Sequence, residues 1–498
     1  MIEGLLDALS PSSMLVIVIG VFLGIIVGAL PGFTATMGTA LLLPFTFDLE
    51  PLQGLAMLGA LYVSSQFADA VPACLVNTPG TPSAMATAFD GFPLTQQGKG
   101  QKALVAAGFS ALVGTFIGGL VFLFLSRPLA EVALRFGPAE FFWVGVFSLT
   151  IIGSIAGNSL VRGLSGGLVG MLIGTIGLSA TGSVSRYTFG EPDLRGGVNI
   201  VAALIGVFAL PQVLNMVSER KENLTIAKYV RSAGVAMETV LEIVRRPVNL
   251  IRSSVIGTLV GILPGAGGPV ASLVAYNEAQ RWSKDKRKFG KGTLDGVVAS
   301  EAAGNGCAGG SMVPLVALGI PGSAPAAVIL GALLLQGIQP GPQLFGSRPE
   351  LVFGFGWSMI LAGAVTFVAS MLLAGSLARM VMIPVRLLAP IVLFLSVIGS
   401  FAIRNNMTDV YLMVGIGIVV YLLGLVGVHP GPIGLGVILG PIIEPALVQA
   451  MSLSQGSSVS EVFLGSKVSI FLIVLTLIST AWIIWSNQRE HRLVDFDD

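Results

Sequence analysis

The segment that decides the fold is Gly24-Ile25-Ile26-Val27-Gly28-Ala29-Leu30-Pro31-Gly32. Its pattern, Gly-x-x-x-Gly-x-Leu-Pro-Gly, returns 233 residues later as Gly257-Thr258-Leu259-Val260-Gly261-Ile262-Leu263-Pro264-Gly265. A second shared pattern follows each copy, because the spacing of Pro72 and Pro79-Gly80 is also that of Pro314 and Pro321-Gly322. Two shared patterns in the same order indicate an internal duplication. The alternative is that each pattern is no more than a set of loop prolines at helix ends.

The composition indicates a membrane protein. Of 498 residues, 54% are hydrophobic and only 11% are charged, whereas soluble domains carry about 25% charged residues. Several uniformly apolar runs approach the roughly 20 residues that span a bilayer as a helix. These runs are 14–30, 103–126, 141–157, 198–217, 352–374, 408–428 and 468–486. With the shorter interrupted runs included, we expect an all-α polytopic protein with about 10–12 membrane-embedded helical segments.

Glycine and proline are too frequent for a simple helix bundle. The chain has 65 glycines and 27 prolines, and membranes tolerate broken helices only where the freed backbone faces protein or a wet cavity. Paired breaks at matching places in two halves are typical of a transporter's substrate site. The pattern therefore predicts broken helices or re-entrant hairpins in each half, in a transporter or channel.

Basic residues are concentrated in two stretches, which the positive-inside rule places in the cytoplasm together with the tail bearing Arg489 and Arg492. The stretches contain Arg220, Lys221, Lys228, Arg231, Arg245, Arg246 and Arg252, and then Arg281, Lys284, Lys286, Arg287, Lys288 and Lys291. Nucleic-acid binding is the other interpretation of such clusters, but a polytopic protein disfavours it. We predict a first membrane repeat over 1–218, a cytoplasmic amphipathic linker over 219–252, and a second repeat with a short tail over 253–498.

Equivalent breaks in the two halves have opposite charge. After the first Pro-Gly pattern the next polar break holds Asp48 and Glu50, whereas after the second it is the lysine-rich 281–291. After the second motif the bias reverses, with Lys99 and Lys102 in one half and only Arg348 in the other. Opposite bias is expected of two repeats inserted upside down relative to each other, which places a substrate site near the membrane midplane.

Four broken segments couple Pro-Gly to small or hydroxyl residues: 29–39, 76–84, 262–272 and 319–327. A helix that begins after such a break offers unpaired N–H groups and the positive end of its dipole, which suit an anion. The predicted substrate contacts are Asn77, Thr78, Pro79, Gly80, Thr81, Ser83, Gly322, Ser323, Thr34, Thr36, Gly267 and Gly268. For each residue taken alone, helix capping in a tight turn remains an alternative.

Two carboxylates in apolar surroundings are candidates for cation coupling. Glu301 lies about ten residues past the basic loop, which at about 1.5 Å per residue places it about 15 Å into the membrane. Asp69 lies in a similar run, and Asn305 follows Glu301 by one helical turn. An ionisable side chain at that depth is costly and suggests function. The alternatives are an interfacial carboxylate or a structural hydrogen bond.

The sequence contains few residues of the types that enzymes use for catalysis. His429 and His491 are the only histidines, Cys74 and Cys307 the only cysteines, and no Walker-type loop occurs. We therefore expect no catalytic residues, no cofactor and no metal beyond a Na⁺ site, with an ion gradient as the energy source.

These motifs, with Asn77-Thr78-Pro79-Gly80, the run 304–310 and Gly319-Ile320-Pro321-Gly322-Ser323, resemble the large membrane subunit of the tripartite tricarboxylate transporters. The resemblance extends over roughly residues 14–485. It implies a multi-pass protein of the bacterial inner membrane that imports citrate or another carboxylate with Na⁺ or H⁺. It also implies two partners, a small membrane subunit and a periplasmic solute-binding protein. Analogy to other carboxylate transporters suggests an elevator motion.

We therefore expect the substrate-translocating subunit of a secondary carboxylate importer. Two alternatives remain. A stand-alone channel or exporter for small organic anions would have the same broken helices. A membrane-embedded enzyme would need a group that activates a water molecule, and the residues that flank Asp69 and Glu301 include none.

Overall fold

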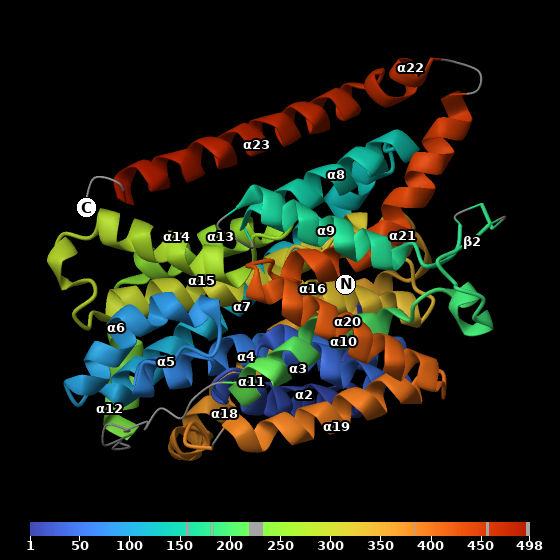
Figure 1. Cartoon of the computed structure of the whole chain (residues 1–498). Helices are drawn as coiled ribbons and strands as arrows, with labels where there is room; N and C mark the ends of the chain where they lie inside the picture. The colour runs from blue at the N-terminus through green and yellow to red at the C-terminus, as the bar shows by residue number, and fades with distance from the viewer. Residues whose placement is uncertain are drawn as a thin grey trace. The chain divides into compact units, whose positions relative to one another are not determined.

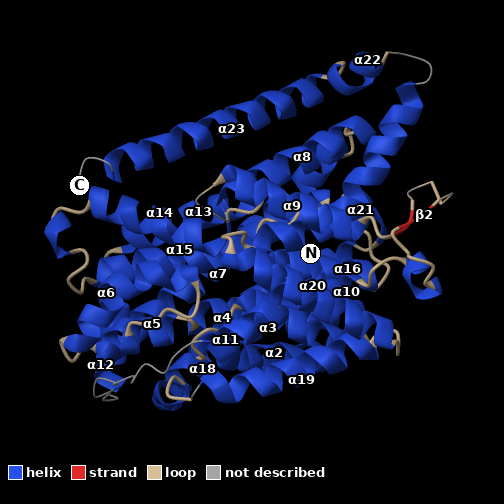
Figure 2. Cartoon of the chain, in the orientation of Figure 1, coloured by secondary structure: helices blue, strands red, loops and turns tan. Residues whose placement is uncertain are grey.

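The local structure is almost entirely helical, as the apolar runs predicted. The structure, a computed structural model, describes residues 1–155, 159–179, 181–182, 184–218, 233–383, 385–454 and 458–494. Within those ranges the only strands are β1 (Gly177–Leu178) and β2 (Ser185–Arg186), an antiparallel pair in which Gly177 faces Arg186 (Figure 2). The all-α prediction is confirmed.

The chain divides into two compact units, and each takes residues from both halves of the sequence (Figure 1). Unit 1 consists of Met1–Ala130 and Gln212–Gly399, and unit 2 of Glu131–Pro211 and Ser400–Asp498. The chain passes between the units within three helices, α7 (Gly100–Ala133), α11 (Leu210–Ser218) and α19 (Val385–Ala402). A boundary in the sequence between repeats is therefore not a boundary between compact units, and the division into repeats stays a prediction.

Unit 1 contains all four predicted breaks. Its helices before the basic stretches are α1 (Ile2–Ala8), α2 (Pro11–Ala29), α3 (Ala35–Leu42), η1 (Leu43–Thr46), α4 (Pro51–Ala68), α5 (Ala70–Val76), η2 (Pro82–Ala84), α6 (Met85–Gln96) and most of α7. The later ones are most of α11, then α12 (Ala233–Val244), α13 (Pro247–Ile262), α14 (Gly267–Trp282), η4 (Lys286–Lys288), α15 (Leu294–Leu318), α16 (Ala324–Leu335), α17 (Pro342–Ser347), α18 (Pro349–Met380) and most of α19.

Unit 2 holds the β1–β2 pair and the remaining helices. They are α8 (Pro138–Ile155), α9 (Leu160–Gly174), η3 (Pro192–Gly196), α10 (Ile200–Phe208), α20 (Met407–Leu425), α21 (Pro430–Leu453), α22 (Val459–Leu464) and α23 (Lys467–Val494). Within this unit Arg186 pairs with both carboxylate oxygens of Glu444, at 2.7 and 3.0 Å, and so fastens β2 to α21. This bidentate geometry is the strongest form of an Arg–carboxylate pair.

Six helices among the described residues are long and apolar enough to cross a membrane. They are Pro11–Ala29, Gly100–Ala133, Ile200–Ser218, Pro349–Leu373, Met407–Leu425 and Pro430–Leu453. Five match predicted runs. The sixth, in α21, is not among those runs, and its helix continues through Pro441 and Pro445. Runs 141–157 and 468–486 form α8 and α23, whose apolar parts are shorter, and 156–157 lie outside the described residues. The chain is a multi-pass membrane protein.

The first repeated motif makes the same backbone turn twice. Leu30 (ψ 122°) and Leu263 (ψ 123°) are both extended, because the following proline disfavours a helical residue before it. Gly32 (φ 81°) and Gly265 (φ 78°) then take the left-handed conformation that glycine adopts without strain. Helices α2 and α13 therefore end at the same point of the motif, and α3 and α14 begin just after it.

The Gly-x-x-x-Gly part of the motif brings helices into close contact. A Cβ added at Gly24 would lie 2.4 Å from the Leu61 carbonyl oxygen of α4. A Cβ added at Gly257 would lie 2.1 Å from the Ala303 carbonyl oxygen of α15. Only glycine permits such an approach of backbones. The motif therefore packs α2 on α4 and α13 on α15.

The second repeated motif explains the equal spacing of its prolines. Thr78 N donates to the Pro72 carbonyl and Ile320 N donates to the Pro314 carbonyl, so each proline lies six residues before its donor. Between them, Asn77 (φ 54°) and Gly319 (φ 74°) are left-handed residues that end α5 and α15. A left-handed residue is a common helix end, in which glycine is usual and asparagine is tolerated.

The predicted linker is described only in part. Residues 219–232 lie outside the described residues. Residues 233–244 form the helix α12, with Met237, Leu241 and Val244 exposed and Thr239 and Ile243 buried. Helix α13 begins at Pro247, so the last six residues of the predicted linker belong to a helix of unit 1.

Candidate functional site

Each predicted break separates two helices, and the breaks lie against one another inside unit 1. In the second half, Gly265 N donates to the Gly322 carbonyl at 3.0 Å, which joins the first break to the second. In the first half, Gly80 lies beside Gly28, since a Cβ on Gly80 would be 3.4 Å from the Gly28 carbonyl oxygen. Each half thus brings its own two Pro-Gly breaks together.

The two halves also meet at their breaks. Gly268, at the start of α14, lies against Ser83 and Gln66. A Cβ built on Gly268 would be 2.7 Å from Ser83 Oγ and 3.0 Å from Gln66 Nε2. Gln66 comes from the buried helix α4, and it also lies beside Gly304 of α15, at 3.4 Å from a Cβ built there. Backbone without side chains on one half therefore faces hydroxyl and amide groups of the other.

Ser323 is held in a buried network of hydroxyl groups. Its Oγ accepts from Ala326 N at 3.3 Å and thereby caps the N-terminus of α16. It also lies 3.2 Å from the Tyr62 hydroxyl and 3.2 Å from Ser311 Oγ. The capping alternative is therefore realised for Ser323, and the same hydroxyl still faces two further polar groups.

Asp69 is a buried carboxylate with one oxygen in use. It lies at the junction of α4 and α5, and its Oδ2 accepts from the Thr81 hydroxyl of the second break. Its Oδ1 is buried and, among the described residues, has no hydrogen-bond partner. An acceptor left unpaired in this way costs about 1–3 kcal/mol unless another group meets it.

Glu301 and Asn305 form a second buried acceptor group, on α15. Glu301 Oε1 accepts from Thr87 Oγ1, which also lies 2.8 Å from Ser300 Oγ. Asn305 Nδ2 donates to the Glu301 carbonyl at 3.0 Å and lies 3.5 Å from Glu301 Oε2. Because both of these neighbours are acceptors, the amide nitrogen faces them, and Asn305 Oδ1 is left buried and unpaired within the described chain.

The other predicted contacts take local roles or stay near the breaks. Thr34 caps α3 by accepting from Met37 N, and Thr78 donates to the Val76 carbonyl. Asn77 is exposed and ends α5, whereas Gly322 is buried. The remaining predicted residues that are neither fully buried nor fully exposed are Thr36, Pro79, Gly80 and Thr81. Gly267 has a φ of 63°, and a Cβ built on it would lie 4.0 Å from Ser323 Cβ.

Three polar residues of this region were missed by the sequence reasoning. They are Tyr62, Gln66 and Thr87, which contact Ser323, Gly268 and Glu301 respectively. Tyr62 and Gln66 stand one helical turn apart in α4, whose residues from Gly54 to Ala68 are all buried. Polar side chains at i and i+4 in a fully buried helix are the signal that could have identified them.

Among the residues that the structure describes, none of the side chains named above as contacting the breaks is basic. An anion bound here would be met by backbone N–H groups, hydroxyls, amides and the positive ends of helix dipoles. The carboxylates Asp69 and Glu301 would repel it unless a cation lies between. The chemistry of the site therefore suits an anion only together with a cation.

Comparison with known proteins identifies the family of this chain. The model of the "Tripartite tricarboxylate transporter TctA family" matches residues 14–435. An Agrobacterium vitis protein described as "Uncharacterized 52.8 kDa protein in TAR-I ttuC' 3'region" is 34% identical over 489 residues, which cover 98% of this chain and 96% of that protein. A second protein from the same organism, described as "Uncharacterized protein in TAR-II ttuC' 3'region", is 37% identical over 236 residues, 47% of this chain and 97% of its own length. No solved structure matches. This chain belongs to the tripartite tricarboxylate transporter TctA family.

Proposed function

We propose that this chain is the substrate-translocating subunit of a binding-protein-dependent secondary transporter that imports a tricarboxylate such as citrate, or a related carboxylate. The observation that supports this most directly is the meeting of the helix breaks of both halves around Ser83, Gly268 and Ser323. Paired broken helices at the interface of two repeats are where secondary transporters bind their substrates.

The substrate carboxylates would be held by helix starts and hydroxyls. Helices α14 and α16 begin within this cluster, and their first N–H groups have no partner within their own helix. Ser83 is the hydroxyl nearest to the Gly268 backbone. The absence of a side chain at Gly268 leaves that backbone open to a ligand, which is the usual reason for glycine where a ligand approaches closely.

The coupling ion would bind at the unpaired acceptors, and Na⁺ fits them better than H⁺. Asn305 Oδ1 is an amide oxygen, which coordinates a cation but does not take up a proton in the physiological range. Glu301 lies one turn away and supplies a negative charge, and Asp69 Oδ1 is a further unpaired acceptor. A cation bound first would lower the cost of bringing a multiply charged anion into the membrane.

The two halves would act as inverted repeats. The matched turns at Leu30 and Leu263, and the matched helix ends at Asn77 and Gly319, support a structural duplication. All four breaks belong to unit 1, so in an elevator-type transport cycle unit 1 would move with the substrate as one body. The inversion itself rests on the opposite charge of equivalent loops.

The family implies two partners, a small membrane subunit and a periplasmic solute-binding protein. In this proposal the binding protein delivers the carboxylate at the outer face of the bacterial inner membrane. The small subunit completes the membrane complex. No cofactor and no nucleotide is required, because the ion gradient supplies the energy.

The test is uptake of radiolabelled citrate into proteoliposomes that contain this chain and its small membrane partner. The binding protein and a Na⁺ gradient are each added or left out. Uptake that requires both establishes the proposal with citrate as substrate. Uptake that requires neither would instead establish a channel. If citrate is not taken up but another carboxylate is, the proposed substrate is wrong and the proposed mechanism stands.

A further inference from the structure

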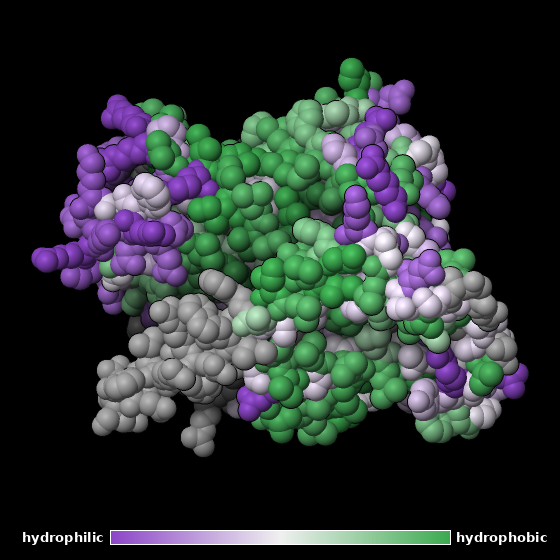
Figure 3. All heavy atoms as spheres, turned by 90° about the horizontal axis from the view of Figure 1, so that it is seen from above, coloured by the Kyte–Doolittle hydropathy of each residue, from purple (hydrophilic) through white to green (hydrophobic). Residues whose placement is uncertain are grey.

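A large cavity lies at the end of unit 1 where α14 ends and α15 begins. Its volume is about 1010 Å³, and it is bounded by residues from α6, α12, α13, α14 and the 283–295 segment. It is separate from the helix breaks, since none of the residues of the candidate site lines it. Figure 3 shows hydrophilic residues gathered at the left, the side on which Figure 1 places α6 and the end of α14.

The lining of this cavity is strongly basic. Nine of its side chains are Lys or Arg and three are Asp or Glu. Two of the acids are already paired, Glu242 with Lys102 at 2.6 Å and Asp285 with Lys288 at 3.1 Å. Only Asp295 is left to oppose the other seven cations. Seven cations around one carboxylate repel one another unless a further anion is present.

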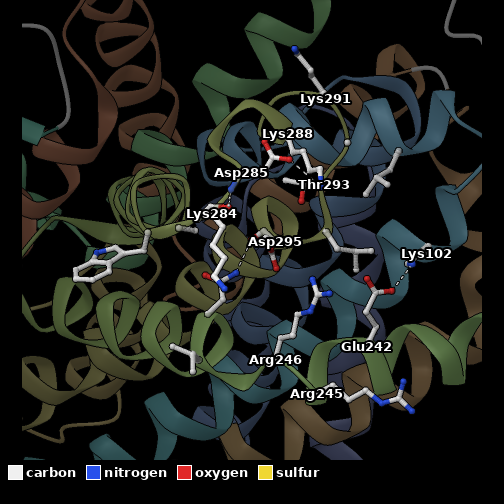
Figure 4. Close-up of a pocket in the computed structure, with 18 of the residues that line it drawn as sticks. Lys102, Glu242, Arg245, Arg246, Lys284, Asp285, Lys288, Lys291, Thr293 and Asp295 are labelled. Carbon is white, nitrogen blue, oxygen red and sulfur yellow. Dashed lines mark hydrogen bonds and ion pairs between the residues drawn. The ribbon is translucent and has the colours of Figure 1, made fainter.

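Several of these groups converge on one place. Figure 4 shows Arg246 pointing toward Asp295, whereas Arg245 and Lys291 point away from it. Arg252 donates to Asn249 Oδ1 at 3.0 Å, and Asn249 Nδ2 donates to the Asp295 carbonyl at 2.9 Å. Arg252 Nε is buried and, among the residues described, has no hydrogen-bond partner. The wall of the cavity thus presents one guanidinium group held in place, that of Arg252, beside the positive charge of Arg246. Guanidinium donors match phosphate oxygens.

Apolar side chains are exposed at the rim. Trp282 is 70% exposed and Val248 is 73% exposed, and both line the cavity. Helix α12 leads into the rim with the exposed residues Met237, Leu241 and Val244, spaced four and three apart. Exposed tryptophan and an apolar helix stripe are features of the membrane–water interface.

We propose that this cavity binds the phosphate headgroup of an anionic phospholipid, whose acyl chains lie along the apolar stripe of α12. The shared chemistry is that of a phosphate oxyanion, for which a free phosphate compound is the other source. The rim decides between the two, because a free anion makes no use of Trp282 and the α12 stripe. Basic pockets at helix ends on the cytoplasmic side are suited to lipid headgroups.

The test is native mass spectrometry of the delipidated full chain, titrated with cardiolipin, phosphatidylglycerol or phosphatidylcholine. The test variant combines Arg246→Gln, Lys284→Gln and Lys288→Gln. The control combines Arg281→Gln, Arg348→Gln and Arg379→Gln, three exposed basic residues that do not line the cavity. A third variant, Arg246→Lys, Lys284→Arg and Lys288→Arg, keeps the charge.

We expect the wild type to bind the anionic lipids and not phosphatidylcholine. At roughly fivefold per basic residue, the test variant should bind about 100-fold more weakly. The control and the charge-keeping variant should bind within about threefold of wild type. A melting temperature of the lipid-free test variant equal to that of wild type shows that it is folded.

Two results would overturn the proposal. The first is equal binding of anionic lipid by the test variant and the wild type. The second is competition by glycerol phosphate or inorganic phosphate at the concentrations at which the lipid binds, because the cavity would then be a site for a free anion. If the test variant loses both lipid binding and its fold, the charge-keeping variant decides. The proposal then stands only if the charge-keeping variant binds anionic lipid as the wild type does.

Discussion

The hydroxyl groups of Tyr62 and Ser323 lie 3.2 Å apart in the buried part of unit 1, although 261 residues separate them in the chain. Tyr62 belongs to α4 in the first half, and Ser323 caps α16 at the second break of the other half. This pair therefore joins the two halves at a helix break. Any ligand bound at the start of α16 would lie beside it.

Ser323 offers a way to separate capping from substrate binding. Replacing an N-cap serine by glycine costs only a few tenths of a kcal/mol, whereas alanine costs about 1 kcal/mol. If the hydroxyl binds the carboxylate, Ser323→Gly should raise the half-saturating substrate concentration about tenfold or more, while the melting temperature falls only by the loss of the buried contacts to Tyr62 and Ser311. Uptake kinetics and thermal unfolding measure the two effects. If the uptake kinetics of Ser323→Gly equal those of wild type, Ser323 caps α16 and does not bind the substrate.

Asn305 is expected to set the dependence on sodium. Asn305→Ala removes the unpaired buried amide oxygen, so the Na⁺ concentration for half-maximal uptake should rise about tenfold or more. The matched control is Asp409→Asn, which alters a buried carboxylate of unit 2 and should leave that concentration unchanged. Uptake is measured over a series of Na⁺ concentrations at constant ionic strength. An identical Na⁺ curve for Asn305→Ala and wild type would remove Asn305 from the ion site.

Gly268 is expected to be essential for transport but not for folding. A Cβ there meets only the mobile ends of Ser83 and Gln66, at 2.7 and 3.0 Å, and these can rotate away. Gly268→Ala should therefore fold with a melting temperature near that of wild type while its uptake falls at least tenfold, because the methyl group and the displaced side chains occupy the substrate's place. Full uptake in this variant would place the substrate elsewhere.

Gly257 is expected to be essential for folding. Its Cβ would meet backbone, 2.1 Å from the Ala303 carbonyl oxygen, and neither α13 nor α15 can yield without separating. Gly257→Ala should lower the free energy of unfolding by about 3 kcal/mol or more. Gly415→Ala in α20 is the control, because a Cβ there meets nothing within 4 Å, and helix propensity should make it neutral or slightly stabilising. Thermal unfolding in detergent compares the two, and an equal response would contradict the packing argument.

Asp90 is expected to hold the two halves together near the basic cavity. Its carboxylate accepts from Gly292 N at 2.8 Å, Thr293 N at 2.9 Å and the Tyr276 hydroxyl at 2.9 Å, all from the other half. Asp90→Ala leaves two backbone N–H groups unpaired and should cost about 3 kcal/mol, whereas Tyr276→Phe should cost about 1 kcal/mol. In the double variant the two losses should not add, because the Tyr276 bond is already absent. Strict additivity would show that the two side chains do not interact.

Much of the fold follows from local rules that the sequence displays. Leu30-Pro31-Gly32 and Leu263-Pro264-Gly265 end their helices wherever they stand, because proline restricts the residue before it and glycine accepts the left-handed turn. The spacing of Pro72 and Pro314 to their breaks likewise follows from one helix-end motif. Local rules do not determine α21, because this helix continues through Pro441 and Pro445 although proline usually ends or kinks a helix.

The sequence by itself determined that this chain is a helical membrane protein with two matching sets of helix breaks, because hydropathy and Pro-Gly turns act over a few neighbouring residues. Only the tertiary structure decided which polar groups share a site. Thr87 reaches Glu301 across 214 residues, and Gln66 reaches the backbone of Gly268, because the close packing of glycine-bearing helices brings α4, α6, α14 and α15 into contact. Such contacts depend on which helices pack together, and a polar residue in a buried helix does not specify its partner.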